Sequence, residues 1–185
     1  MRYPRILLAA STVLAAGLIV IATAGSGAAA PEATHSELQV SYAKNYRTLT
    51  ELRAASSAAV KVVAESQRSE QLGGVPTTVT TVKVTRTISG TNPGSSIEIR
   101  QLGTSEVTGN ISKLMQPGHE YLVFLVPSTG ADDAAPNRYL IAGESGLYEL
   151  QGNQYQFRGR DLAPGEPQKL PTSVQAGVAE AAAAR

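Results

Sequence analysis

Two stretches, residues 60–67, VKVVAESQ, and residues 80–88, TTVKVTRTI, have side chains that alternate with a period of two, with mainly polar residues at every second position. Successive side chains of a β-strand point to opposite faces, so a period of two predicts two strands, each with one polar face. Gly73 and Gly74 lie between the stretches and indicate a turn. The threonine-rich outer face suits β-structure because branched side chains fit a pleated surface. These stretches therefore predict a long β-hairpin.

More strands are expected on the C-terminal side of the hairpin. Residues 121–126, YLVFLV, are apolar on both faces, which predicts a central strand. Ile97 and Ile99 alternate with Glu98 and Arg100, so the two isoleucines are expected on the buried face and the charged pair on the other. Gly146 and the Gly152-Asn153 turn separate three short expected strands, at 138–142, 147–150 and 154–157. The mixed residues 101–116 are expected to form a long loop.

The segments that flank these strands carry other signals. Thr48 and Glu51 have the spacing of a capping box, which predicts a short helix over 49–56 with Leu49 and Leu52 buried. Small and polar residues predict a linker over 31–46. Residues 161–185 read as a proline-containing and then alanine-rich tail, either helical or disordered. The strands and the short helix together predict one all-β domain over 47–160, as a small β-barrel of six or seven strands or as a two-sheet sandwich.

The N-terminal 30 residues have the layout of an export signal. Arg2 and Arg5 precede an uncharged, mostly apolar stretch at 6–25, and small residues follow at 24–30. This arrangement is typical of a signal peptide. The apolar stretch is also long enough to span a bilayer, so a cleaved signal and a retained N-terminal membrane anchor both remain open. In either case residue 31 onward is expected outside the cytoplasm.

Composition excludes several classes of function. The chain of 185 residues contains no cysteine, which excludes disulfides, thiolate metal sites and cysteine nucleophiles. Its two histidines are too few for a three-histidine metal site within one chain. Without Arg2 and Arg5 the remaining chain holds 14 basic and 15 acidic residues, and the charges are scattered. A nucleic-acid partner is therefore not expected, because phosphate binding requires a basic patch.

Four strand motifs carry a family resemblance. They are the strand end at 82–90 with its V-K-V and final glycine, the I-E-I-R-Q-L-G stretch at 97–103, the G-H-E-Y-L-V-F-L stretch at 118–125 and the G-L-Y-E-L stretch at 146–150. Their order resembles that of small bacterial exported domains of uncharacterised function. It also resembles the OB-type barrel of tissue inhibitors of metalloproteinases and netrin-like modules. The resemblance covers residues 47–158 and implies an OB-like barrel. Those inhibitors engage metal through an N-terminal cysteine, which this chain lacks, so their mode of inhibition is not carried over.

Two groups of residues are candidates for chemistry. Asp132, Asp133 and Asn137 share one polar loop and offer oxygen ligands for calcium, but they lack an acidic D-x-D-x-D spacing, which favours a solvated surface loop. His119 lies beside Glu120 in a predicted turn, where it would be a general base, a metal ligand or, as the simpler interpretation, a solvent-facing residue. Residues 143–146, GESG, fall one residue short of a serine-hydrolase nucleophile elbow and are expected to form a turn.

Tyrosine is the most abundant aromatic residue, with seven copies against two of phenylalanine. Tyr139, Tyr148 and Tyr155 lie in predicted strands and, with His119, form a candidate binding surface for sugar rings or peptides. The alternative is that their rings pack in the core. No cofactor is expected.

The sequence therefore favours a non-catalytic binding module whose partner is an envelope protein or glycan. One alternative is an inhibitor of an extracellular hydrolase, with residues 127–137 as the projecting segment. The other is an envelope hydrolase, which requires His119, Glu120 and a second carboxylate to converge in one cleft.

Overall fold

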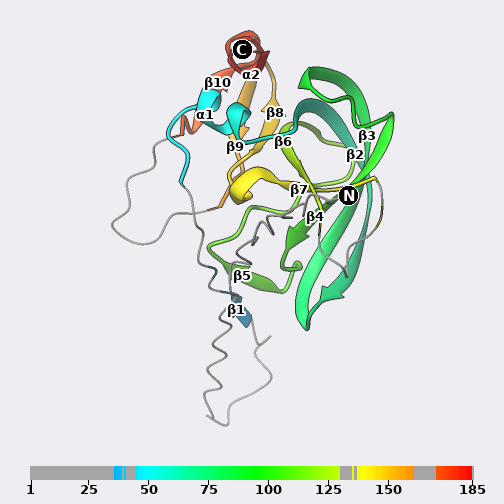
Figure 1. Cartoon of the computed structure of the whole chain (residues 1–185). Helices are drawn as coiled ribbons and strands as arrows, with labels where there is room; N and C mark the ends of the chain where they lie inside the picture. The colour runs from blue at the N-terminus through cyan, green and yellow to red at the C-terminus, as the bar shows by residue number, and fades with distance from the viewer. Residues whose placement is uncertain are drawn as a thin grey trace, which may run out of the picture.

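The computed structural model describes residues 36–38, 40, 45–129, 135, 137–160 and 170–184. In these residues the protein is mainly β (Figure 1). The elements are β1 (Ser36–Leu38), α1 (Leu49–Ala54), β2 (Ala58–Leu72), β3 (Val75–Gly90), β4 (Ser96–Leu102), β5 (Val107–Gly109), β6 (Glu120–Pro127), β7 (Arg138–Ile141), the 3-10 turn η2 (Ala142–Glu144), β8 (Leu147–Gln151), β9 (Gln154–Phe157), β10 (Ser173–Gln175) and α2 (Ala176–Ala184).

The long hairpin predicted from the sequence is confirmed. Strands β2 and β3 pair antiparallel from Ala58 opposite Gly90 to Leu72 opposite Val75, and the turn is at Gly73–Gly74. The pairing register shifts at three places along β2. Such irregularities bend a strand and increase its twist. The curved hairpin in Figure 1 therefore wraps around the other strands instead of lying flat.

The remaining strands extend this hairpin into one sheet of eight strands, in the order β10-β9-β8-β6-β2-β3-β4-β7. Strand β7 pairs parallel with β4 and also antiparallel with β6. The five strands β2, β3, β4, β7 and β6 thus form a partial ring, while β8, β9 and β10 continue outward from β6. The sequence predicted that six or seven strands form a small barrel. In the structure only five strands form the ring, and three lie outside it. The sandwich alternative does not match a single continuous sheet.

Strand β6 separates two hydrophobic cores, which explains its apolar sequence. Val123 and Leu125 belong to a core inside the ring, which also contains Ile97 and Ile99. Leu122 and Phe124 belong to a second core, which lies between β6 and the helices and also contains Leu52. All residues from 121 to 125 are buried, so the predicted central strand is confirmed.

Helix α1 begins where the capping pattern predicts. The Thr48 hydroxyl accepts a hydrogen bond from the Glu51 backbone N–H at 3.0 Å. The Glu51 carboxylate accepts one from the Arg47 backbone N–H at 2.8 Å. These side chains satisfy backbone donors that have no partner within the helix. Leu49 and Leu52 are buried, as expected.

Three segments are more ordered than the sequence suggested. Within the expected linker, Ser36–Leu38 forms β1, which pairs parallel with β5. Strand β4 extends to Leu102, and β5 lies within the expected 101–116 loop. In the alanine-rich segment α2 contacts α1 and β3, with Ala179 fully buried. Because alanine side chains are small, they let a helix pack closely against its neighbours. The weak apolar periodicity of this segment did not indicate that it packs in this way.

The apolar stretch at 6–25 lies outside the described residues. Among the helices of the described residues, none has the length and apolar character needed to cross a membrane.

A candidate binding pocket

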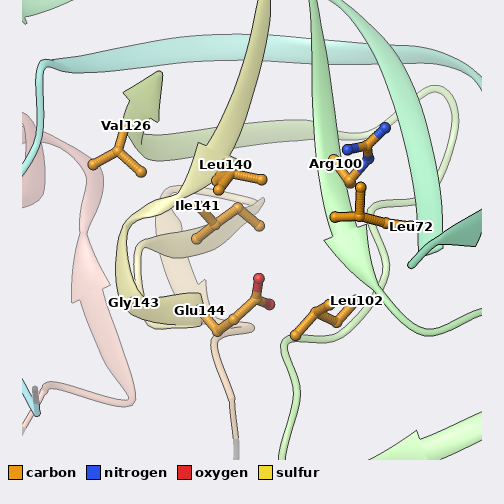
Figure 2. Close-up of a pocket in the computed structure, with 8 residues that line it drawn as sticks. All are labelled: Leu72, Arg100, Leu102, Val126, Leu140, Ile141, Gly143 and Glu144. Atoms are coloured by element: carbon orange, nitrogen blue, oxygen red, sulfur yellow. The ribbon is translucent and has the colours of Figure 1, made fainter. Parts of the chain in front are cut away.

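A pocket of about 250 Å³ is bordered by strands β2, β4, β6 and β7 and by the turn η2. Figure 2 shows its lining side chains converging from several strands and from η2. Most of the lining is aliphatic, and two charged residues complete it. The lining residues are Leu72, Arg100, Leu102, Val126, Leu140, Ile141, Gly143 and Glu144. A dry apolar cavity of about 150 Å³ already accommodates benzene, so this space suffices for an aliphatic side chain.

Strand pairing brings the aliphatic wall together from distant parts of the sequence. Arg100 of β4 lies opposite Leu140 of β7, and Leu140 lies opposite Val126 of β6. Leu102 follows Arg100 on the same face of β4, because successive side chains alternate. Leu72 is the last residue of β2, at the turn of the long hairpin.

The opposite wall is built by an unusual stretch of backbone. Gly143 and Glu144 in η2 have φ values of 56° and 55°. Glu144 is the single non-glycine residue with a positive φ in the part of the chain that the structure describes. This left-handed conformation costs an ordinary residue about 1–2 kcal/mol. Strained backbone of this kind is concentrated at functional sites.

This backbone points the carboxylate of Glu144 into the pocket (Figure 2). The residue is only 7% exposed. Its Oε2 accepts hydrogen bonds from the Ser112 hydroxyl at 2.5 Å and from the Ser112 backbone N–H at 3.3 Å. Burial raises the pKa of Glu144 to about 6, while the hydrogen bonds from Ser112 and the charge of Arg160 act in the opposite direction. A carboxyl group with a perturbed pKa in an apolar pocket is a typical sign of a functional site.

Arg100 ties the pocket to an ion-pair network on the neighbouring strands. Its Nη2 lies 2.8 Å from Oε2 of Glu70. Arg138 approaches the same carboxylate at 3.3 Å and Glu98 at 2.7 Å. Arg68 pairs with Glu98 at 2.7 Å and with Glu70 at 3.0 Å. Three guanidinium groups thus share two carboxylates, and Arg100 is the member of this network that lines the pocket.

These contacts explain two properties of the network. The hydrogen bond from Arg68 is the largest influence on the pKa of Glu98, which is lowered to about 2. The pKa of Glu70 is lowered chiefly by its hydrogen bond from Arg100. Arg100 itself is only 3% exposed, although it lies on the face of β4 opposite to the two isoleucines, as the sequence predicts. The alternation along β4 is real, but the ion-pair network and the pocket cover its second face.

Two of the three tyrosines considered above, Tyr148 and Tyr155, do not form an exposed surface. Tyr148 and Tyr155 are fully buried in the second core. The ring of Tyr148 packs edge-on against Phe157, with a centroid separation of 5.4 Å. Tyr139 is half-buried against the core inside the ring. The core alternative is therefore correct for Tyr148 and Tyr155, because β8 and β9 face the helices and not solvent.

His119 is half-exposed and does not meet Glu120. Its Nδ1 lies 2.5 Å from Oε1 of Glu149, whose Oε2 accepts a hydrogen bond from Nε of Arg158 at 2.6 Å. Glu120 instead pairs with Lys61 at 3.0 Å. The convergence of His119 with Glu120 that the hydrolase alternative requires is thus not seen, although a different carboxylate holds the imidazole.

The suggested calcium ligands are only partly visible. Asp132 and Asp133 lie outside the described residues. Asn137 is exposed, and its backbone carbonyl accepts a hydrogen bond from the Glu98 N–H at 3.0 Å. Within the described ranges no three His, Asp or Glu residues come together as a metal site.

Sequence reasoning missed the pocket, because its lining comes from five separate elements. The one local signal was the GESG stretch at 143–146, where a charged residue follows a glycine between two strands. No protein-family model and no curated protein matches this sequence. The geometry of the pocket is therefore the main guide to function.

Proposed function

We propose that this protein is an exported, non-catalytic binding module of the cell envelope. Its site is the apolar pocket, which receives a side chain with an aliphatic stem from a partner protein. The observation that carries the proposal is the pocket itself, an aliphatic cavity of about 250 Å³ with Glu144 on its wall. Anchoring side chains that fill such pockets supply much of the affinity of protein interfaces.

The strand connections support an OB-like barrel as the scaffold. In chain order the ring strands are β2, β3, β4, β6 and β7, and the third pairs parallel with the fifth. The fourth pairs with the first. OB-folds bind ligands on the face of their second and third strands and at the loops after the first and fourth. Leu72 borders the loop after the first ring strand and Leu102 ends the third, and this position supports the pocket as the binding site.

A protein partner is favoured over a glycan. Sugar rings are commonly bound by exposed aromatic side chains, which offer an apolar face beside a polar group. The pocket lining contains no aromatic residue. Tyr148 and Tyr155 are buried, so they are not available for stacking. An aliphatic cavity instead fits a methylene chain or a branched aliphatic side chain.

Export is supported by the sequence of the N-terminus. Arg2, Arg5 and the apolar stretch at 6–25 have the order of a signal or anchor segment. The proposal therefore places the pocket outside the cytoplasm, in a protein that is either released or tethered to the membrane.

Capture from an envelope extract tests the proposal. The full-length chain is immobilised as wild type, as Val126→Trp, which fills the pocket, and as Val178→Trp. Val178 is 59% exposed on α2, so it provides the same substitution away from the pocket. Circular dichroism verifies that both variants fold.

We expect one protein to be captured by wild type and Val178→Trp but not by Val126→Trp. Equal capture by all three chains, or capture of a polysaccharide alone, contradicts the proposal.

A further inference from the structure

Resting on the proposed function, we infer that the pocket is specific for a lysine side chain of the partner protein. The aliphatic wall takes the methylene chain, and the carboxylate of Glu144 accepts hydrogen bonds from the terminal ammonium group. This assignment goes beyond an apolar anchor, because it specifies a partner for the methylene chain and for the terminal charged group of the bound side chain.

The hydrogen-bonding pattern of Glu144 leaves one oxygen for a ligand. Oε2 takes both hydrogen bonds from Ser112. Among the described residues, no donor is bonded to Oε1. An ionised carboxylate has room for several donors on its two oxygens. Ser112 is itself fixed, because its hydroxyl accepts from the Gln101 amide at 3.1 Å, so the carboxylate is held in one orientation.

The rest of the lining suits the methylene chain of lysine. Lysine carries an apolar stem that packs along apolar surface and a charged end that needs polar contacts. Here Leu102, Leu140 and Ile141 surround the space into which the Glu144 carboxylate points (Figure 2). A purely aliphatic side chain would leave the Oε1 oxygen of this buried carboxylate without a hydrogen-bond donor, which is unfavourable.

Arg100 does not compete for the same position. In Figure 2 its guanidinium lies on the other side of the pocket from the Glu144 carboxylate. Its Nη2 is engaged by Glu70 at 2.8 Å, which offsets its charge. The influences on the pKa of Glu144 are burial, Ser112 and Arg160, so Arg100 is not a significant counter-charge for this carboxylate. A ligand carboxylate, by contrast, would meet Glu144 as a like charge.

Three matched probes distinguish the contribution of the terminal group to binding from that of the methylene chain. They are the Nα-acetyl methylamides of lysine, of norleucine, which ends in a methyl group, and of 2-aminoadipate, which ends in a carboxylate. Each is titrated into the full-length protein at pH 7.5, and the backbone amide signals of Gly143 and Leu102 are followed by NMR. The same titrations use Glu144→Gln and, as a matched control, Glu106→Gln at an exposed position.

We expect the lysine probe to bind best to the wild type and to Glu106→Gln. Replacement of Glu144 should weaken it at least about tenfold, because the ammonium group loses a hydrogen bond to a charged oxygen, which is stronger than one between neutral groups. Binding of the norleucine probe should change little. The wild-type comparison of the three probes needs no variant, so it decides the matter even if Glu144→Gln misfolds.

Two results would overturn the lysine assignment. One is equal or tighter binding of the aminoadipate or norleucine probe by the wild type. The other is binding of the lysine probe that is unchanged in folded Glu144→Gln. If only the norleucine probe binds, the lysine assignment is wrong but the apolar pocket of the proposed function still stands. The proposed function itself fails if partner capture is insensitive to Val126→Trp.

Discussion

At the scale of single residues, Glu144 combines two unfavourable features. Its backbone has a positive φ, and its carboxyl group is buried beside aliphatic side chains. Both lower the stability of the folded chain. Their coincidence at the wall of a pocket is one of the observations on which the proposed binding role rests.

The raised pKa of Glu144 predicts a pH dependence of stability. The folded state holds a proton up to about pH 6, whereas the unfolded carboxyl loses it near its ordinary value of 4.5. The free energy of unfolding should therefore fall as pH rises through this window and stay low above it. The loss is about 2 kcal/mol, from about 1.4 kcal/mol for each pKa unit. Glu144→Gln keeps an oxygen for Ser112 but does not titrate.

Urea unfolding at pH 4.5 and pH 7 measures this effect. Relative to wild type, Glu144→Gln should gain about 1.5 kcal/mol between the two values, because the unfolded carboxyl is already half ionised at pH 4.5. Glu106→Gln serves as the control for the loss of one carboxyl group at an exposed site. A difference between Glu144→Gln and wild type that is constant with pH would contradict the prediction.

At the scale of elements, α2 is attached by small side chains on one side and by charges on the other. Ala179 and Ala183 are fully buried in the second core. Glu180 reaches Lys61 at 3.3 Å and Arg86 at 3.3 Å, on β2 and β3. The backbone carbonyl of Ala183 accepts a hydrogen bond from the Ser89 hydroxyl at 2.5 Å. The helix is therefore part of the packed structure.

Close packing at Ala179 predicts that a larger residue is not accommodated. Ala179→Leu should lower the free energy of unfolding by about 1–3 kcal/mol, the usual cost of overpacking a core. Ala181→Leu is the matched control, because Ala181 is exposed on the same helix and leucine is a good helix former. Denaturant unfolding of both variants measures the difference. Equal effects of the two substitutions would show that α2 does not pack tightly.

At the scale of the whole molecule, β6 connects the parts of the fold. It pairs with β2 along one side and with β7 and β8 along the other, and its two faces belong to different cores. Strands β1 and β5 have three residues each and pair only with each other within the described chain. Local stability should therefore differ sharply between these two regions.

Hydrogen exchange of the full-length chain tests this difference. The amides of residues 122–125 should exchange only through global unfolding, with the same dependence on urea as the paired amides of β2. The amides of β1 and β5 should exchange faster and with little dependence on urea. If β6 exchanged in an opening that left β2 protected, the ring would not be a single cooperative unit.

The sequence by itself determined the elements that depend on local pattern. The alternation around Val62 and Val82, the two-sided apolar run at 121–126 and the cap at Thr48 each involve neighbours in the chain. Strand and helix formation respond to that local spacing, so the mainly β class, the hairpin and α1 could be predicted.

Only the tertiary structure decided the pocket and the partial ring. The pocket depends on pairings such as Arg100 with Leu140 and Leu140 with Val126, between residues far apart in the chain. No local period encodes these contacts. For the same reason the alternation along β4 did not reveal that Arg100 is buried, and the isolated GESG stretch did not show where Glu144 points. The burial, the charged neighbours and the backbone conformation of Arg100 and Glu144 all depend on packing between segments that are far apart in the chain.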